Sequence, residues 1–180
     1  YSAAPGWPKI EDHHKDGQID ADDYQILGTP SPDWTMGMNN TFTYKNWDLS
    51  VYAYTQIGGL YSDSFTFYFL GLNNQDWNKL AVDYWTPENR NNKYPGIGLE
   101  CLWTQALAQV SGTFLKIQNV TLGYTVPENI VDRLKVKEVR AYLAVQNPFT
   151  FTKYLGSDPQ IIGENLSTQL SLYPMTWTFG

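Results

Sequence analysis

The chain has 180 residues, of which 16% are aromatic and 17% are charged, and its formal net charge is -6. The negative charge argues against a nucleic-acid partner, because phosphate binding needs a basic surface. The single cysteine, Cys101, can form neither an internal disulfide nor a cysteine-based metal centre. No run of about 18 apolar residues predicts a transmembrane helix.

Residues 1–32 are polar and rich in Asp, Gly and Pro, which predicts a loop. Its segment DHHKDGQIDADD (12–23) has the spacing of an EF-hand calcium loop, with ligands at positions 1, 3, 5, 7, 9 and 12 and a glycine at position 6. The spacing therefore predicts a structural Ca²⁺ site. Its candidate ligands are Asp12, Asp16, the backbone carbonyl of Gln18, Asp20 and Asp23.

Other interpretations of this acidic loop stay open. His14 stands at position 3, and imidazole is a poor calcium ligand, so water or a shifted register would have to complete the coordination. Without an ion, the same residues can form a solvated turn that is closed by Asx-type hydrogen bonds. A transition-metal site at His13 and His14 has little support, because the chain has no other histidine.

Residues 33–57 form two runs of alternating apolar and polar side chains around the polar pair Lys45–Asn46. A period of two predicts strands with one apolar face, and two such runs around a tight turn predict a β-hairpin. The mostly apolar side is formed by Met36, Met38, Asn40, Phe42, Tyr44, Trp47, Leu49, Val51, Ala53 and Ile57, with Thr55 between the last two. The other side carries Asp48, Ser50, Tyr52, Tyr54 and Gln56.

Residues 58–112 break this rhythm and are too many for an ordinary connection, which predicts a functional loop with local structure of its own. Leu102–Val110 can form a short helix. Aromatic and amide side chains in this loop are candidates for stacking on sugar rings and binding hydroxyl groups. They are Trp77, Tyr84, Trp85, Trp103 and Asn91. The alternative, which we favour, is that the rings pack the loop or a partner protein.

Residues 113–180 predict three further strands, at 114–126, 139–151 and 173–179. In the first of them Leu115 and Ile117 are out of phase with Val120 and Leu122, which predicts a bulge near Gln118–Asn119. A moderate connection (127–137) and a polar loop (153–169) separate the three strands.

The strand lengths and loop lengths together suggest part of an outer-membrane β-barrel. Each strand has about ten residues or more, which is the span that a tilted strand needs to cross a bilayer. If the strands run up and down, both shorter connections lie at one end and the long loops at the other, as in such barrels. A soluble β-sandwich alternates in the same way, so periodicity alone leaves both architectures open.

Several stretches, taken together, resemble the SusC/RagA-type TonB-linked outer-membrane transporters. They are KDGQIDADDYQILGTPSPDW (15–34), FTYKNWDLSVY (42–52), YWTPENRNNKYP (84–95), LKIQNVTLGYTVP (115–127), VQNPFTFTKYLGSDP (145–159) and YPMTWTFG (173–180). The resemblance implies an all-β fold: the C-terminal strands of a transmembrane antiparallel barrel that has 22 strands in the family. Family members are several times longer and continue past the final TFG, so the resemblance implies a C-terminal fragment.

The same resemblance implies a location and partners. We expect the cell outer membrane of a Gram-negative, Bacteroidetes-like bacterium, contact with outer-membrane lipid, and a SusD-like surface lipoprotein as partner. The TonB complex would act through an N-terminal part that is missing here, and the cargo would be an oligosaccharide or a peptide. Residues 1–32 and 58–112 would be extracellular loops, 33–57 a barrel hairpin, and 113–180 the last strands with a periplasmic turn and an extracellular loop.

An enzyme is not expected, because the chain has no G-x-S-x-G, H-E-x-x-H, P-loop or G-x-G-x-x-G motif. The alternative function is a soluble β-sandwich that binds carbohydrate and holds a structural calcium. That alternative requires the apolar strand faces to be buried against a second layer of protein.

Overall fold

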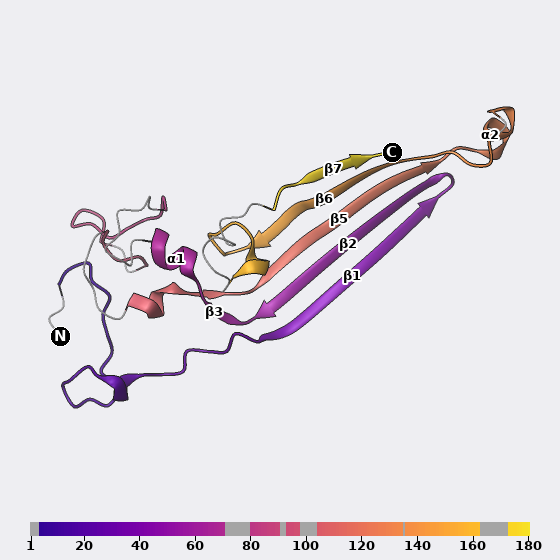
Figure 1. Cartoon of the computed structure of the whole chain (residues 1–180). Coiled ribbons are helices and arrows are strands. Elements are labelled where there is room, and N and C mark those ends of the chain that lie inside the picture. Colours follow the sequence, from indigo (N-terminus) through magenta and orange to yellow (C-terminus); the bar gives the residue numbers. More distant parts are fainter. Residues whose placement is uncertain (1–3, 71–79, 91–92, 98–103, 135, 163–172) are drawn as a thin grey trace.

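The computed structural model describes residues 4–70, 80–90, 93–97, 104–134, 136–162 and 173–180. Five strands form one antiparallel sheet in the order β1-β2-β5-β6-β7, and they run side by side as a long open ribbon (Figure 1). They are β1 (Pro32–Tyr44), β2 (Trp47–Gly58), β5 (Phe114–Thr125), β6 (Arg140–Thr152) and β7 (Thr176–Phe179). These strands do not close into a barrel.

The predicted hairpin is confirmed, with β1 and β2 joined by a two-residue turn. Lys45 takes a positive φ of 53°, which lets Tyr44 pair directly with Trp47. Asn46 also ties the turn to β5. Its side-chain amide donates to the carbonyl of Thr125 at 2.9 Å, and the N–H of Thr125 donates to the Asn46 carbonyl at 2.8 Å. The turn therefore fixes the register of three strands.

The predicted bulge is confirmed at Gln118 in β5. Against β2, Tyr52 pairs with Asn119 and Ala53 with Ile117, so Gln118 is the extra residue. One inserted residue moves the following side chains to the opposite face. Leu115 and Ile117 are thereby returned to the face of Val120 and Leu122, and the apolar side stays continuous.

The last strand is shorter than its sequence pattern predicts. Only four residues of β7 pair with β6, from Leu143 to Gln146. Beyond Gln146, Asn147 has a φ of 52° and Pro148 has no N–H to donate, so that edge of β6 offers no regular ladder.

Two short helices correct the purely all-β prediction to a mostly β fold. They are α1 (Ser64–Phe69), within the long loop, and α2 (Glu128–Leu134), within the connection between β5 and β6. The expected helix at Leu102–Val110 is instead a 3-10 turn, η2 (Thr104–Ala108), followed by β4 (Gln109–Ser111), which pairs with β3 (Leu60–Ser62). Leu102 and Trp103 lie outside the described residues.

The connections gather at the two ends of the long sheet (Figure 1). The hairpin turn and α2 lie at one end. At the other end lie α1, the small β3-β4 sheet and the 3-10 turns η1 (Ala21–Asp23), η2 and η3 (Pro159–Ile161). We call these the turn end and the loop end. The separation of short and long connections that the sequence suggests is therefore present.

The hydrophobic core is small and lies at the loop end, not under the sheet. Leu70 and Ala108 are buried there, and partly buried apolar side chains surround them. These side chains are Phe67, Leu80, Val82, Tyr84 and Tyr94. Within the described residues no helix is long and apolar enough to cross a membrane.

One face of the sheet is mostly apolar, with Asn40 and Thr55 as polar exceptions, and it lacks a covering layer among the described residues. Phe42, Phe149 and Phe179 are 61%, 60% and 83% exposed, while Ala53 and Val145 are buried. The small β3-β4 sheet lies beyond the end of the strands, not over their face (Figure 1). The β-sandwich alternative requires such a cover, so the described fold does not support it.

Candidate functional site on the polar face and at the loop end

The second face of the sheet is polar and almost uncharged. The register places on it alternate side chains of all five strands. They include Thr35, Asn39, Thr41, Thr43, Ser50, Tyr52, Tyr54, Gln56, Asn119, Thr121, Tyr142, Gln146, Thr150, Thr176 and Thr178. Asp48, Lys116 and Arg140 are the charged residues of its paired positions, and Asp33 lies in the bulge at the start of β1.

Arg140 and Asp48 form an ion pair at the turn end. Arg140 Nη2 lies 2.6 Å from Asp48 Oδ2, and its Nε donates to Oδ1 at 3.3 Å. The pair joins β2 to β6 across β5, directly over Gly123. A Cβ at residue 123 would clash with both charged groups, so the crossing requires a glycine.

Lys116 and Asp158 form a second ion pair, and this one is buried at the loop end. Lys116 points from the polar face of β5 into the segment around η3, where its ammonium group binds the carboxylate of Asp158. It also donates to Gln160 Oε1 at 2.9 Å and lies 5.5 Å from the centre of the Tyr173 ring. The side chains of Lys116 and Asp158 are 2% and 5% exposed. Residues 158–161 are therefore anchored on the sheet.

Asp63 is a second buried centre of hydrogen bonds, and it is 1% exposed. It caps α1 by accepting from the N–H of Thr66 at 2.8 Å, and it also binds the Thr66 hydroxyl. The hydroxyl of Tyr154 donates to its other carboxylate oxygen at 3.0 Å. Burial, and after it the charge of Asp63, raises the pKa of Tyr154 above its ordinary value, so the phenol keeps its proton.

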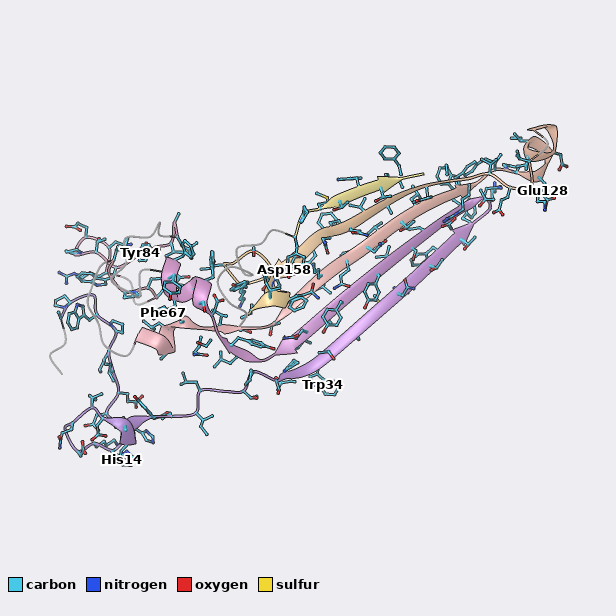
Figure 2. The ribbon with its side chains drawn as sticks, viewed as in Figure 1. His14, Trp34, Phe67, Tyr84, Glu128 and Asp158 are labelled. Carbon is cyan, nitrogen blue, oxygen red and sulfur yellow. The ribbon has the colours of Figure 1, made fainter. Side chains whose placement is uncertain are left out.

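A cavity of about 290 Å³ opens beside α1. Its lining is formed by Ser62, Asp63, Ser64, Phe67, Tyr68 and Ala108. The rings of Phe67 and Tyr68 stand edge to face with centres 5.5 Å apart. Figure 2 shows Phe67 and Asp158 at the same end of the sheet, with Glu128 at the opposite end.

Of the aromatic side chains predicted to bind substrate, Tyr84 and Trp85 lie in the described part, and both contact other residues of the protein. Tyr84 belongs to the small core, its ring centre lies 6.4 Å from that of Tyr94, and burial raises the pKa of its phenol. Trp85 lies against the backbone of Gly6. Both placements agree with the alternative that the rings pack the loop. Trp77, Trp103 and Asn91 lie outside the described residues.

The acidic loop is closed by hydrogen bonds from backbone N–H groups to carboxylates. Asp12 accepts from Lys15 and from Gly17, the latter at 2.8 Å. Asp23 accepts from His13 at 2.8 Å, from His14 at 3.2 Å and from Asp20 at 3.1 Å. The bonds from Asp20 and His14 lower the pKa of Asp23, which keeps it ionised.

The same loop does not assemble a metal centre in the described conformation. Among the described residues no three acidic, histidine or cysteine side chains are close enough together to hold an ion. Asp16 accepts from the N–H of Gln18 at 2.8 Å and Asp20 from that of Asp22 at 2.9 Å, so each turns to its own backbone. This is the geometry of the Asx-turn alternative.

Sequence reasoning missed the two buried polar centres. Lys116 does carry a signal, because a lysine between Leu115 and Ile117 in a strand needs a partner or water. Its partner Asp158 is 42 positions away, and Tyr154 is 91 positions from Asp63. No local pattern links such residues.

Comparisons with known proteins identify the family. The chain is 31% identical over 169 residues to TonB-dependent receptor P3 of Formosa agariphila, and 27% identical over 179 residues to TonB-dependent receptor SusC of Bacteroides thetaiotaomicron. Each alignment covers 93% of this chain, but the chain spans only 17% and 16% of those relatives. No family model matches the chain.

Solved structures show the same fold. The RagAB peptide importer in its open-open state aligns with a TM-score of 0.64 at 23% identity, over 81% of this chain and 16% of that one. The closed-closed state aligns with a TM-score of 0.60. The matched proteins are described as receptors and as an importer, which supports the expectation that the chain is not an enzyme. The chain is thus homologous, over most of its length, to the SusC/RagA-type TonB-dependent receptors.

Proposed function

We propose that the chain is part of a TonB-dependent transporter that imports oligosaccharides or peptides across the outer membrane of a Gram-negative bacterium. The uncovered apolar face of the five-stranded sheet carries this proposal. Such a face is costly in water and stable against lipid tails, whereas the neutral polar face suits a water-filled interior. The four long strands have 12 or 13 residues, enough to cross the hydrocarbon layer at a tilt.

The two ends of the sheet fit the two sides of that membrane. Short connections are typical of the periplasmic side and long loops of the outside, so the loop end faces outwards in this proposal. Tyr44, Trp47 and Tyr124 form an aromatic row across three strands at the turn end, with the last two ring centres 4.7 Å apart. Phe149 and Phe151 lie at the loop end of β6. Two rows of rings suit the two interfaces of a bilayer.

Trp177 departs from that arrangement. It pairs with Val145, close to the middle of β6. In this proposal Trp177 therefore contacts acyl chains instead of head groups.

The partners follow from the family. A SusD-like surface lipoprotein would cover the loop end, and the TonB complex would act through the part of the receptor that precedes these strands. The structurally similar RagAB complex is described as a peptide importer, so peptides remain a candidate cargo beside oligosaccharides.

An uptake experiment with the full-length receptor tests the proposal. Wild-type cells and cells without the receptor gene are given a mixture of short neutral oligosaccharides and tryptic peptides, and depletion of the medium is followed by mass spectrometry. Wild-type cells should deplete some of these compounds faster, and deletion of tonB should abolish the difference. Equal depletion by all strains would contradict the proposal.

For the acidic loop we keep Ca²⁺ as a separate proposal, with a structural role. The positions of Asp12, Gly17 and Asp23 support it, while the described conformation lacks an assembled site. Binding would require Asp16 and Asp20 to give up their backbone hydrogen bonds. Isothermal titration of the full-length receptor with CaCl₂ should show one site that is lost in Asp12→Asn with Asp23→Asn. Identical heats for both proteins would exclude calcium from this loop.

A further inference from the structure

The cavity beside α1 is small and has a mixed lining. At about 290 Å³ it lies near the lower end of the ~300–1,000 Å³ range of ligand pockets. That is the space of roughly ten water molecules. Ser62 and Ser64 contribute hydroxyl groups, and Phe67 and Tyr68 contribute rings. The size suits one ring-shaped unit of a larger molecule.

Among the described lining residues, Asp63 is the only charged one, and its carboxylate is already bound by Tyr154 and twice by Thr66. With 1% of its surface exposed, Asp63 supports the wall of the cavity and does not present charge to it. A charged ligand group placed there would lose part of its hydration and find no counter-charge among the described lining residues, at a cost that an uncharged group avoids.

The position of the cavity is fixed by a chain of contacts to the sheet. Tyr154 holds Asp63, and Asp63 caps the helix that carries Phe67. Four residues after Tyr154, Asp158 is bound by Lys116 of β5. The rings of α1 are therefore tied to the loop end of the polar face, along which uncharged side chains continue.

We propose that this cavity is a subsite for one uncharged, ring-shaped unit of the cargo, and that Asp63 and Tyr154 are positioning residues for it. Because the rings of Phe67 and Tyr68 are nearly perpendicular, one would stack on the flat face of the unit and the other would contact its edge, where the serine hydroxyls would bind polar groups. A sugar ring and an uncharged peptide side chain share this chemistry. The inference rests on the proposed transport function and adds to it a discrimination against charged cargo.

The first test measures the concentration dependence of uptake by the full-length receptor in cells. Three probes are compared: short neutral oligosaccharides, peptides of uncharged residues, and peptides of equal length that contain Lys or Glu. Uncharged probes should be imported, and Phe67→Ala or Tyr154→Phe should raise the half-saturating concentration about tenfold with an unchanged maximal rate. Phe151→Ala, on the apolar face, is the control and should change neither value.

The second test does not depend on removing a packed side chain. Ser62 is exposed at the cavity, so Ser62→Asp adds a charge there, and Ser62→Asn is its neutral control. Only Ser62→Asp should improve uptake of Lys-containing peptides over uncharged ones.

The possible outcomes separate three claims: the subsite, the positioning role of Tyr154, and transport itself. Import of charged peptides as readily as uncharged ones, or an unchanged charge preference in Ser62→Asp, overturns the subsite but leaves transport standing. A lower maximal rate with unchanged half-saturation in Tyr154→Phe overturns its positioning role. Import of no probe class by the wild-type receptor overturns the transport proposal itself.

Discussion

Two ion pairs lie on the same face of the sheet, at opposite ends, and they differ in burial. Lys116 and Asp158 have side chains that are 2% and 5% exposed, whereas those of Arg140 and Asp48 are 41% and 26% exposed. Water screens the charges of Arg140 and Asp48 and does not reach those of Lys116 and Asp158. Removal of one partner should therefore cost more stability at the buried pair than at the exposed pair. The loop end has buried ionic and polar contacts, whereas the turn end combines strand pairing with the Asn46 side-chain bond and the exposed ion pair.

The largest expected effect comes from breaking the buried pair. Asp158→Ala leaves the Lys116 ammonium group buried without a counter-ion, which should cost about 3–5 kcal/mol of the stability of the anchored segment. In the full-length receptor in detergent micelles, amide hydrogen exchange of residues 153–162 should rise strongly.

A double variant sharpens this prediction. Lys116→Met with Asp158→Leu removes both charges and keeps apolar volume, so much of the protection should return. If the amides of residues 153–162 exchange in Asp158→Ala as they do in the wild type, this segment is held by something other than the ion pair.

The next effect concerns Tyr154. Tyr154→Phe leaves Asp63 without one buried donor, which should weaken the attachment of α1 by about 1–3 kcal/mol. Amide exchange of residues 64–69 measures this loss. Unchanged exchange would show that the capping bonds of Asp63 hold α1 without Tyr154.

The same residue predicts a dependence on alkaline pH. Because the pKa of Tyr154 is raised in the fold above its usual 10.0, the folded state keeps a proton that the unfolded state loses. The contribution of the Tyr154–Asp63 hydrogen bond to stability is therefore complete below about pH 10 and declines as the pH rises further. In alkaline absorbance titrations, the difference between the curves of the wild type and Tyr154→Phe should have its midpoint above the ordinary tyrosine range. A difference curve centred at or below that range would contradict the raised pKa.

The smallest effect is expected at the exposed pair. Arg140→Ala and Gly123→Ala should each separate Arg140 from Asp48, the second through the added Cβ. Neither change should shift the melting temperature of the receptor measurably, since such pairs gain little in water. A clear destabilisation by Arg140→Ala would mean that the missing part of the receptor buries this pair.

The sheet is largely readable from the sequence, because local rules determine it. Alternation and the Lys45–Asn46 turn predict the first hairpin, and the phase change at Gln118 predicts the bulge. The length of β7 is not predicted, since it depends on Asn147 and Pro148 in the neighbouring strand. The helix α2 is missed for a different reason, as its seven residues are too few for a clear helical period.

The candidate site is far less readable. The acidic loop has a recognisable spacing, but its carboxylates accept hydrogen bonds from nearby backbone N–H groups. The ligand pattern in the sequence does not distinguish this arrangement from metal binding. The cavity beside α1 depends on contacts between residues more than 40 positions apart. Sequence alone shows that Lys116 and Asp63 are charged, and only the fold shows that each is buried with a partner.

The central claim is that one face of the sheet contacts lipid and the other contacts water. Spin labels at single cysteines in the full-length receptor, in lipid bilayers and with Cys101 replaced by Ser, test it directly. Labels at Leu49 and Leu143 should be more accessible to oxygen than to a water-soluble nickel complex. Labels at Ser50 and Tyr142 should be less accessible to oxygen than those at Leu49 and Leu143. Equal accessibility of the two faces to the nickel complex would contradict the claim.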